Sequence, residues 1–208
     1  MPRVHAVSPC MSVRLLKLLS ACAVLTGSLS PACAQVVVDG ATNVLSNVTN
    51  IFAGGVTVGT NGSFTLLVLS NNCLLTNSGL SEIGRNATAR SNEVRLTSSS
   101  ARWQMLNPLH VGVNGSFNRL AISNGAAVQS SQGVIGSSSA SASNNTAVVN
   151  GPGSQWIVPT SFIVGLLGGG NRLEVSDGGR VISDFATVGD VATLFMNHID
   201  PAPPFQLS

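Results

Sequence analysis

Charged residues, aromatic residues and cysteines are all scarce in this chain of 208 residues. Only 9% of the residues are charged and the formal net charge is +2, against roughly 25% charged residues in an average soluble domain. No basic stripe occurs, so nothing supports a nucleic-acid partner. Tyrosine is absent and helix-favouring glutamate and lysine are few. Glycine, serine, asparagine, threonine and valine dominate instead, which favours short β-strands joined by tight turns.

The distribution of the cysteines excludes an intramolecular disulfide downstream of residue 34, where only Cys73 remains. Cys73 is in register with Ala126 and Gly179 of the repeat described below, which predicts a small packed side chain. A reactive thiol is the alternative. The other three cysteines lie before residue 34: Cys10, Cys22 and Cys33.

Sequence motifs of enzymes are also missing. The chain has no CxxC, P-loop, GxSxG or calcium nonapeptide motif. His110 stands where other repeat copies have Thr57 and Ile163, so we interpret it as a strand-surface residue. The acids Asp177, Asp184 and Asp190 lie in the last predicted coils, but their counterparts one copy earlier are not acidic: Asn124, Ser131 and Ser137. We therefore expect no catalytic residue, no cofactor and no metal site.

Residues 1–34 are typical of a helical secretory signal peptide. Arg14 and Lys17 supply its basic start, an apolar run follows over 18–29, and Ala32-Cys33-Ala34 is a cleavage site. The true start is Met1 or Met11. The alternatives are a lipoprotein signal at Cys22 and a buried amphipathic helix. We expect export to the extracellular space or cell surface, or to the periplasm if the chain is truncated.

A long internal repeat organises the rest of the chain. Trp103 and Trp156 are 53 positions apart, and so are successive members of the Val-Gly series Gly59, Gly112 and Gly165. A second series follows Ile or Val at nearly the same spacing: Gly84, Gly136 and Gly189. A fixed long period indicates a stacked repeat architecture.

Each copy contains an alternating strand that ends in a turn. Apolar and polar residues alternate over 120–123 and 173–176, the period of a half-buried strand. Asn71, Asn124 and Asp177 then tolerate positive φ in the turn. We predict that these three stack above one another and that their side chains bond along the column.

Two Val/Ile-Gly steps per copy indicate that each repeat makes two coils. We predict an all-β parallel β-solenoid of about six coils over 51–195, preceded by an N-terminal cap or lead-in over 35–50. Residues 196–208 form a Pro-rich, disordered tail in this interpretation. A propeller, a β-sandwich and a disordered chain fit the register and the apolar content less well.

The motif N-x-L-x-[IV]-S-[ND]-G-[AG]-x-V, followed by NN-x-A-x-V-x-G-P-G-S-x-W, resembles the autotransporter/PEP-CTERM-associated repeat of bacterial exported proteins. The resemblance covers about 51–189. It implies a right-handed β-helix that is exported and often displayed on the surface, and it supplies no active-site residues. Proteins with this repeat usually continue into more copies and a barrel or anchor, so we expect an N-terminal fragment.

The predicted function is that of a non-enzymatic, adhesin-like repeat protein that binds glycans or other cell-surface molecules. A carbohydrate-active β-helix enzyme and a structural matrix protein that associates end to end are the alternatives. No transmembrane segment is expected in the mature chain. Trp103 and Trp156 either stack against a glycan or pack in matching pockets of the fold.

Overall fold

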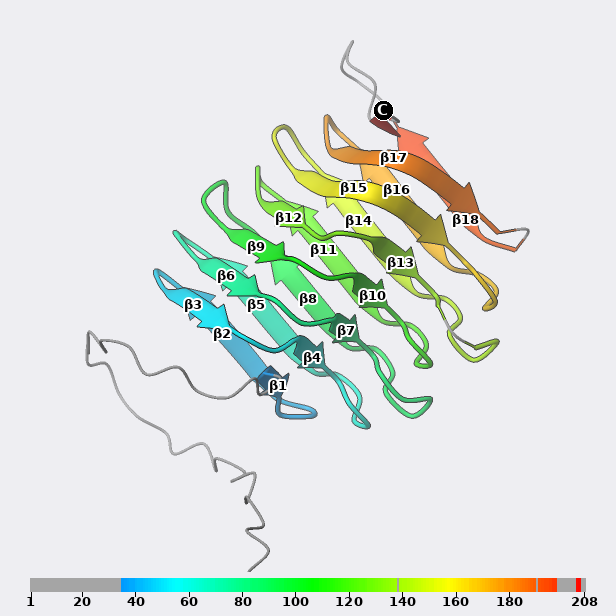
Figure 1. Cartoon of the computed structure of the whole chain (residues 1–208), viewed down its shortest axis with the longest axis horizontal. Helices are drawn as coiled ribbons and strands as arrows, with labels where there is room; N and C mark the ends of the chain where they lie inside the picture. The colour runs from blue at the N-terminus through cyan, green and yellow to red at the C-terminus, as the bar shows by residue number, and fades with distance from the viewer. Residues whose placement is uncertain (1–34, 138, 190, 198–204, 207–208) are drawn as a thin grey trace, which may run out of the picture.

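The computed structural model describes residues 35–137, 139–189, 191–197 and 205–206. These residues form a parallel β-solenoid of about six coils (Figure 1), which confirms the predicted fold class. The predicted signal peptide, residues 1–34, lies outside the described residues.

One side of the solenoid is a seven-stranded sheet whose neighbouring strands pair in parallel. Each coil contributes one strand to it. In chain order the strands are β2 (Thr42–Ser46), β5 (Leu66–Ser70), β8 (Glu93–Leu96), β11 (Arg119–Ser123), β14 (Thr146–Asn150), β16 (Arg172–Ser176) and β18 (Thr193–Asn197).

The other side is a 12-stranded sheet made of two rows, so that each full coil has three strand segments. The first row is β1 (Gln35–Val37), β4 (Val56–Val58), β7 (Ser81–Ile83), β10 (Leu109–Val111) and β13 (Gly133–Ile135). The second row is β3 (Thr49–Phe52), β6 (Leu74–Asn77), β9 (Arg102–Met105), β12 (Ala127–Gln129) and β19 (Phe205–Gln206). Two long strands run through both rows: β15 (Gln155–Val164) and β17 (Arg180–Val188).

The strand register explains the period of the sequence. In the seven-stranded sheet Arg119 pairs with Glu93 on one side and with Thr146 on the other. In the second row Ala127 pairs with Arg102 and with Gln155. The outer members of each set of three are two coils apart in the structure and one full repeat apart in the sequence, so one repeat is two coils, as predicted.

The two sheets enclose an apolar core that also follows the two-coil period. Trp103 and Trp156 are 0% exposed and alternate along the second row with the smaller Val128. The rings of Trp156 and Phe162 meet edge to face, with centroids 4.8 Å apart. A Cβ on Gly133 would lie 2.8 Å from the Phe162 ring and 3.0 Å from that of Trp156. A glycine therefore makes room for the large rings.

A ladder of buried asparagines runs along the axis, one rung per coil. It consists of Asn92, Asn118, Asn145 and Asn171, which are at most 1% exposed. Each Oδ1 from Asn118 onward accepts both the backbone N–H and the Nδ2 of the preceding rung, at 2.9–3.1 Å. Thr65 extends the ladder by donating its backbone N–H to Asn92 Oδ1 at 2.9 Å.

The glycines of the Val/Ile-Gly steps pack directly against the side chains of this ladder. The two glycine series of the sequence merge into one structural column, in which Gly59, Gly84, Gly112 and Gly136 have φ between 72° and 77°. A Cβ at any of these four would overlap the side-chain amide of the next rung. Only glycine combines this φ with such a close approach.

Residues 35–50 form the first coil of the solenoid, at the place where the sequence predicts an N-terminal cap or lead-in. Strands β1, β2 and β3 pair in parallel with β4, β5 and β6 of the following coil. At the other end, within the predicted tail of 196–208, residues 196–197 end β18 and residues 205–206 form β19, which pairs with β17. Residues 198–204 and 207–208 of that predicted tail lie outside the described residues.

Candidate binding surface

The edge that we call the turn corner is built by the turns that connect the first row to the seven-stranded sheet. These turns join β4 to β5, β7 to β8, β10 to β11, β13 to β14 and β15 to β16, and they stack above one another (Figure 1). Each turn places one residue at positive φ directly before a ladder position. Along the stack these residues are Phe64, Ser91, Phe117, Asn144 and Gly170.

Phe64 and Phe117 are the unusual members of this column. Their φ angles are 61° and 58°, a region in which a bulky side chain is a genuine outlier that costs about 1–3 kcal/mol. Their side chains gain little burial in return, because the residues are 75% and 56% exposed. The fold therefore holds two aromatic rings in solvent at a cost to the backbone.

Hydrogen bonds to the next coil fix this backbone. The N–H of Phe64 donates to Arg90 O, and that of Phe117 donates to Ser143 O, both at 3.1 Å. The residues that follow them, Thr65 and Asn118, donate their N–H groups to ladder oxygens at 2.9 Å. The two phenylalanines thus project from a rigid part of the molecule.

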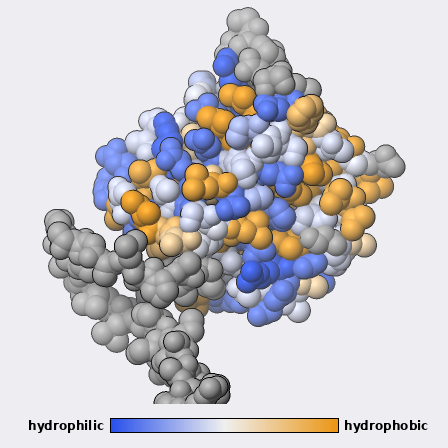
Figure 2. All heavy atoms as spheres, viewed as in Figure 1, coloured by the Kyte–Doolittle hydropathy of each residue, from blue (hydrophilic) through white to orange (hydrophobic). Residues whose placement is uncertain are grey.

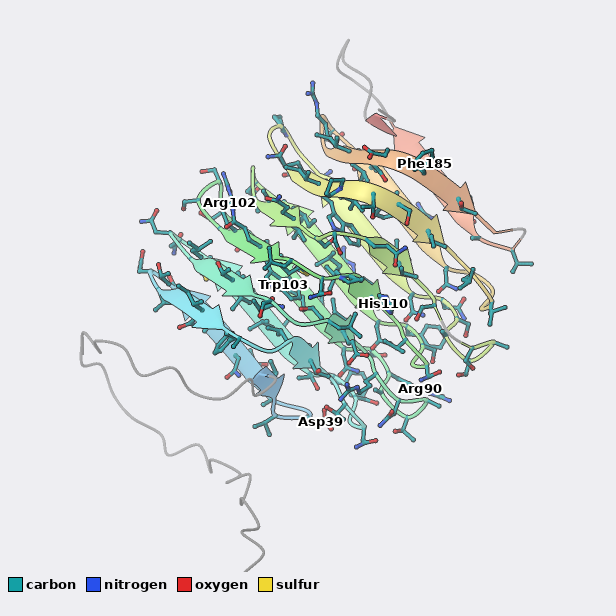
Figure 3. The ribbon with its side chains drawn as sticks, in the orientation of Figure 1. Asp39, Arg90, Arg102, Trp103, His110 and Phe185 are labelled. Atoms are coloured by element: carbon teal, nitrogen blue, oxygen red, sulfur yellow. The ribbon has the colours of Figure 1, made fainter. Side chains whose placement is uncertain are left out.

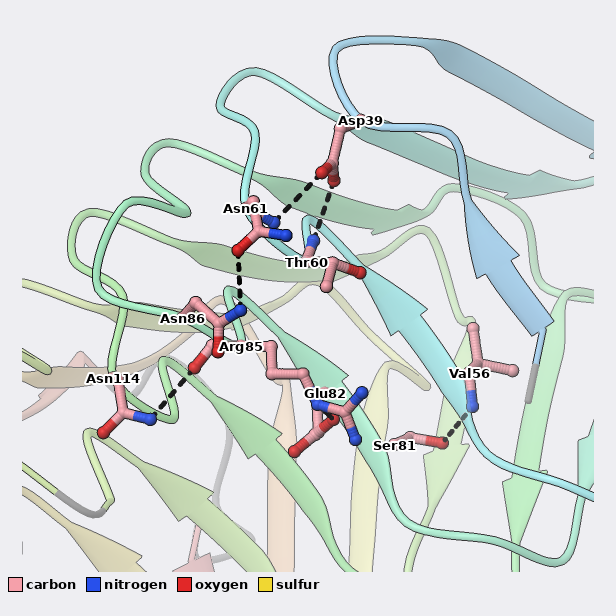
Figure 4. A network of polar contacts seen from close by, with 9 residues as sticks. All are labelled: Asp39, Val56, Thr60, Asn61, Ser81, Glu82, Arg85, Asn86 and Asn114. Carbon is pink, nitrogen blue, oxygen red and sulfur yellow. Dashed lines mark hydrogen bonds and ion pairs between the residues drawn. The ribbon is translucent and has the colours of Figure 1, made fainter.

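Asparagine side chains lie on the two turns that carry the phenylalanines and on the turn between them (Figure 4). Asn86 Nδ2 donates to Asn61 Oδ1 at 2.7 Å, and Asn114 Nδ2 donates to Arg85 O at 3.2 Å. These bonds connect three successive coils. They form a row of polar groups beside the positions that carry the rings.

Asp39 closes the N-terminal end of the turn corner. Its carboxylate accepts the backbone N–H groups of Thr60 and Asn61 at 2.7 and 3.0 Å (Figure 4). It also accepts that of Gly62 at 2.8 Å. In the next coil the N–H groups of the corresponding turn donate to carbonyls of the preceding coil instead. Burial works against ionisation, but the three N–H bonds outweigh it and hold the pKa of Asp39 below its ordinary value. The Asp39 carboxylate thus takes the place that backbone carbonyls have in the later coils.

A titratable cluster lies on the outer side of the first row. His110 on β10 pairs in register with Glu82 on β7, and Thr57 on β4 precedes them. Glu82 is 4% exposed and forms an ion pair with Arg85, Oε2 to Nε, at 2.8 Å. Burial raises the pKa of Glu82, opposed in part by the charge of Arg85 and the hydrogen bond from Thr57.

His110 is half-buried and its environment favours the neutral imidazole. Burial lowers the pKa of His110, and its Nδ1 has no hydrogen-bond partner. Figure 3 shows this residue over the middle of the 12-stranded sheet. It lies on the strand surface, as predicted.

The outer face of the seven-stranded sheet carries ion pairs. Glu93 contacts Arg95 at 2.7 Å and Arg119 at 2.6 Å, and Arg172 contacts Glu174 at 3.0 Å. Burial raises the pKa of Glu93, but the hydrogen bonds and charges of the two arginines lower it below its ordinary value overall. These charges satisfy one another within the sheet. The opposite face, seen in Figure 2, mixes hydrophobic and hydrophilic residues.

The structure corrects the stacking hypothesis for Trp103 and Trp156. Both rings are fully buried, so neither is available to a glycan, and the packing alternative describes their environment. Their Nε1–H groups donate inside the core, to Asn77 Oδ1 at 2.9 Å and to Ser130 Oγ at 3.0 Å. Cys73 is also buried in the core, as predicted, and burial raises the pKa of its thiol.

The predicted column of Asn71, Asn124 and Asp177 is wrong in one respect. They occupy matching positions at positive φ, but they are two coils apart and do not bond to one another. Asn71 Nδ2 donates to Ser46 Oγ at 3.4 Å and Asn124 Nδ2 donates to Thr97 O at 3.2 Å, each one coil earlier. Asp177 Oδ2 accepts from Asn150 Nδ2. The continuous amide ladder is the buried one, which the prediction missed.

Two further pairs of residues that sequence reasoning missed have a signal in the chain. Phe64 and Phe117 end two N-G-S-F motifs, whereas the third copy has Gly170 at that place. Glycine at this position in one repeat copy indicates that the turn has positive φ there, so a bulky residue at the same position in another copy is held at positive φ. The approach of Glu82 to His110 follows from their separation by one coil, which places them side by side on neighbouring strands.

In the described part of the chain, no group of three or more His, Cys, Asp or Glu residues is placed to hold a metal ion. Among the same residues, no helix is long and apolar enough to cross a membrane. Asp190, one of the three last acids of the sequence, lies outside the described residues. Comparisons of the chain with protein-family models, curated proteins and solved structures found no match.

Proposed function

We propose that this chain is a non-enzymatic, exported β-solenoid that presents a recognition surface along its turn corner. The observation that carries the proposal is the pair Phe64 and Phe117, two aromatic rings held in solvent at positive φ. Backbone strain that brings little packing in return is typical of functional sites. Exposed aromatic residues on a rigid scaffold are also typical of binding hot spots.

The architecture supports the same proposal. The asparagine ladder and the strand pairing satisfy the hydrogen bonds of the buried polar groups. The outward side chains can therefore vary without disturbing the coils. The resemblance to the autotransporter/PEP-CTERM-associated repeat and the leader over 1–34 support export and an adhesin-like role. The association of solenoids end to end is a separate property and does not conflict with a lateral binding surface.

Saturable binding of the purified, labelled full chain tests recognition. The targets are intact bacterial cells, isolated cell-wall polysaccharide and extracellular-matrix protein. We expect binding to at least one of them, reduced by Phe64→Asp with Phe117→Asp and unchanged by Leu106→Ala, which alters an exposed residue outside the turn corner. Release of new reducing ends from the polysaccharide would instead support an enzyme, and no binding to any target would contradict the proposal.

Localisation of the product tests export. The chain is expressed with and without residues 1–34 in a Gram-negative host, and cytoplasm, periplasm and medium are assayed separately. We expect the full chain outside the cytoplasm and the shortened chain inside it. Equal retention of both in the cytoplasm would contradict export.

A further inference from the structure

We infer that the turn corner binds a neutral, unbranched glycan that lies along the solenoid axis and stacks on the rings of Phe64 and Phe117. The inference rests on the proposed function, since it names the ligand class of the same surface. Four features of the described residues carry it: the spacing of the rings, the amides beside them, the charge of the corner and its apolar area.

The spacing of the rings matches a polymer of sugars. Phe64 and Phe117 occupy the same place two coils apart, with Ser91 on the coil between them. At about 4.8 Å per coil, two coils separate the ring positions by about 10 Å. A pyranose unit in an extended chain is about as long as the rise of one coil. Every second sugar of an axial chain therefore meets a ring, and the sugar between them lies over Ser91.

The chemistry of the turns suits both sides of a sugar. One face of a pyranose is a layer of C–H groups, which an aromatic ring binds by dispersion and by its negative π face. The rim carries hydroxyls, and amides both donate to and accept from hydroxyls. Asn86 and Asn114 each use one donor in the stack. Their remaining polar groups belong to exposed or partly exposed side chains on the turns beside the rings.

The charge of the turn corner favours a neutral ligand. Its five turns contain no acidic residue and two arginines, Arg85 and Arg90. Arg85 is paired with Glu82, and the carboxylate of Asp39 at the N-terminal end of the corner is bound by three backbone N–H groups. Arg90 is therefore the one arginine of these turns that offers its charge to a ligand. A polyanion with a charge on each sugar would find one partner over the whole corner, which argues against an acidic glycan.

The apolar area is too small and too interrupted for a stable protein interface. An aromatic side chain buries about 150–250 Å² at most, so the two rings supply about 300–500 Å². The exposed Leu166 and Leu167 add apolar area on the turn between β15 and β16, two coils beyond Phe117. A stable protein–protein interface buries about 800 Å² on each partner, with a contiguous apolar centre. Ser91 and Asn144 interrupt the column of rings instead. A second copy of this chain is therefore a poor occupant of the corner.

Calorimetric titration of the full chain tests the inference. The ligands are linear β-1,4-linked oligomers of glucose, mannose and xylose with two and six units, and an oligogalacturonate of six units as the acidic comparison. We expect at least one neutral hexamer to bind more tightly than its dimer, because only the hexamer spans both rings. Each of Phe64→Gly and Phe117→Gly should weaken that binding about two- to tenfold, and the double variant should abolish it.

Two controls separate stacking from other effects. Gly170 occupies the same position in its own turn, so glycine is compatible with the native backbone at Phe64 and Phe117. Circular dichroism checks that the Phe→Gly variants are folded. Leu106→Ala removes an exposed apolar side chain elsewhere and should leave binding unchanged. In NMR spectra of the bound state, saturation of the phenylalanine ring protons should transfer to sugar C–H protons.

The outcomes distinguish this inference from the proposed function. Binding of a neutral hexamer that is unaffected by both Phe→Gly changes overturns the stacking site but leaves recognition intact. Preference for oligogalacturonate with dependence on Arg90 overturns the neutral class alone. Failure of every oligosaccharide, combined with Phe-dependent binding to matrix protein, overturns the glycan and favours a protein ligand. Failure of every target overturns both.

Discussion

Asn118 Nδ2 lies 3.1 Å from Asn145 Oδ1, the side-chain amide one coil further along the axis. The same Nδ2 donates to Ala89 O at 3.1 Å. Asn118 Oδ1 accepts two hydrogen bonds from Asn92, one from its backbone N–H and one from its Nδ2. One buried side chain thereby completes four hydrogen bonds and connects three coils. The ladder is thus the internal support of the turns that carry Phe64 and Phe117.

Removal of a central rung should be strongly destabilising. Asn118→Ala leaves the backbone N–H and Nδ2 of Asn92 and the Ala89 carbonyl without their present partner. Asn145 Oδ1 loses one of its two donors and keeps the backbone N–H of residue 118. Buried polar groups that lose a partner cost about 1–3 kcal/mol each, so we expect a loss of about 3–5 kcal/mol in the free energy of unfolding. Urea titration followed by circular dichroism measures it.

The matched control is Asn114→Ala, a partly exposed asparagine of the same turn with a single side-chain hydrogen bond, which should cost less than about 1 kcal/mol. Equal losses for the two variants would show that the ladder has no special energetic role.

Two glycine positions separate the cost of positive φ from the cost of steric overlap by an added Cβ. Gly112→Ala combines a strained φ of 77° with a Cβ that overlaps Asn145. Gly153→Ala has nearly the same φ, 75°, but its Cβ would meet nothing closer than 3.5 Å. We expect Gly153→Ala to lose about 1–2 kcal/mol, and Gly112→Ala to lose clearly more in thermal and urea unfolding. Similar losses would contradict a packing role for the Val-Gly step.

Much of the fold was predictable because stacking turns a period in sequence into a column in space. The matched spacing of Trp103 and Trp156 follows from two coils, and alternation over 120–123 marks the buried side of β11 correctly. The exterior was harder to predict. Exposure of the tryptophans depends on which side of a strand faces the core, and the pattern around each ring did not distinguish the two sides.

The buried ladder was missed for a related reason. Asn118 and Asn145 are separated by a single coil, and bonding between them becomes apparent only when the coil replaces the two-coil repeat as the unit of comparison. Asn71 and Asn124 were predicted to bond to one another because they recur at the full period of the sequence. That period relates every second coil, which side chains do not bridge.

Asp39 should protect the first turn from local opening. Its carboxylate binds the N–H groups of Thr60, Asn61 and Gly62, so Asp39→Ala should speed hydrogen exchange of these amides, with little change at Val113. Because the folded-state pKa of Asp39 is lowered, its contribution is present above the unfolded pKa of about 3.9 and is lost as the pH falls through the folded value. Unchanged exchange in the variant would contradict the capping role.

His110 should make stability depend on pH in the mildly acidic range. Its folded-state pKa is lowered by burial, so the unfolded chain binds the proton first as the pH falls below about 6.5. The contribution of neutral His110 is present above that pH and is lost as the pH falls towards the folded pKa. We expect His110→Thr, the residue at the matching Thr57, to lose less stability than the parent between about pH 7.5 and 5.5 in urea titrations.

The neighbouring groups Glu82 and Arg85 are the same in parent and variant. The raised pKa of Glu82 acts with the opposite sign, since its contribution is lost as the pH rises. The difference between parent and variant therefore reports His110. An identical pH dependence in the two proteins would show that burial does not perturb this imidazole.

The double variant Phe64→Gly with Phe117→Gly tests the central claim most directly, because stability and binding should change independently. Relief of positive φ gains about 1–2 kcal/mol per site, and the added freedom of the unfolded chain offsets about 0.5–1 kcal/mol of it. We predict a Tm equal to or above that of the parent, together with loss of binding to the ligand identified for the turn corner. A lower Tm, or binding that survives, would contradict the account of Phe64 and Phe117 as a strained recognition pair.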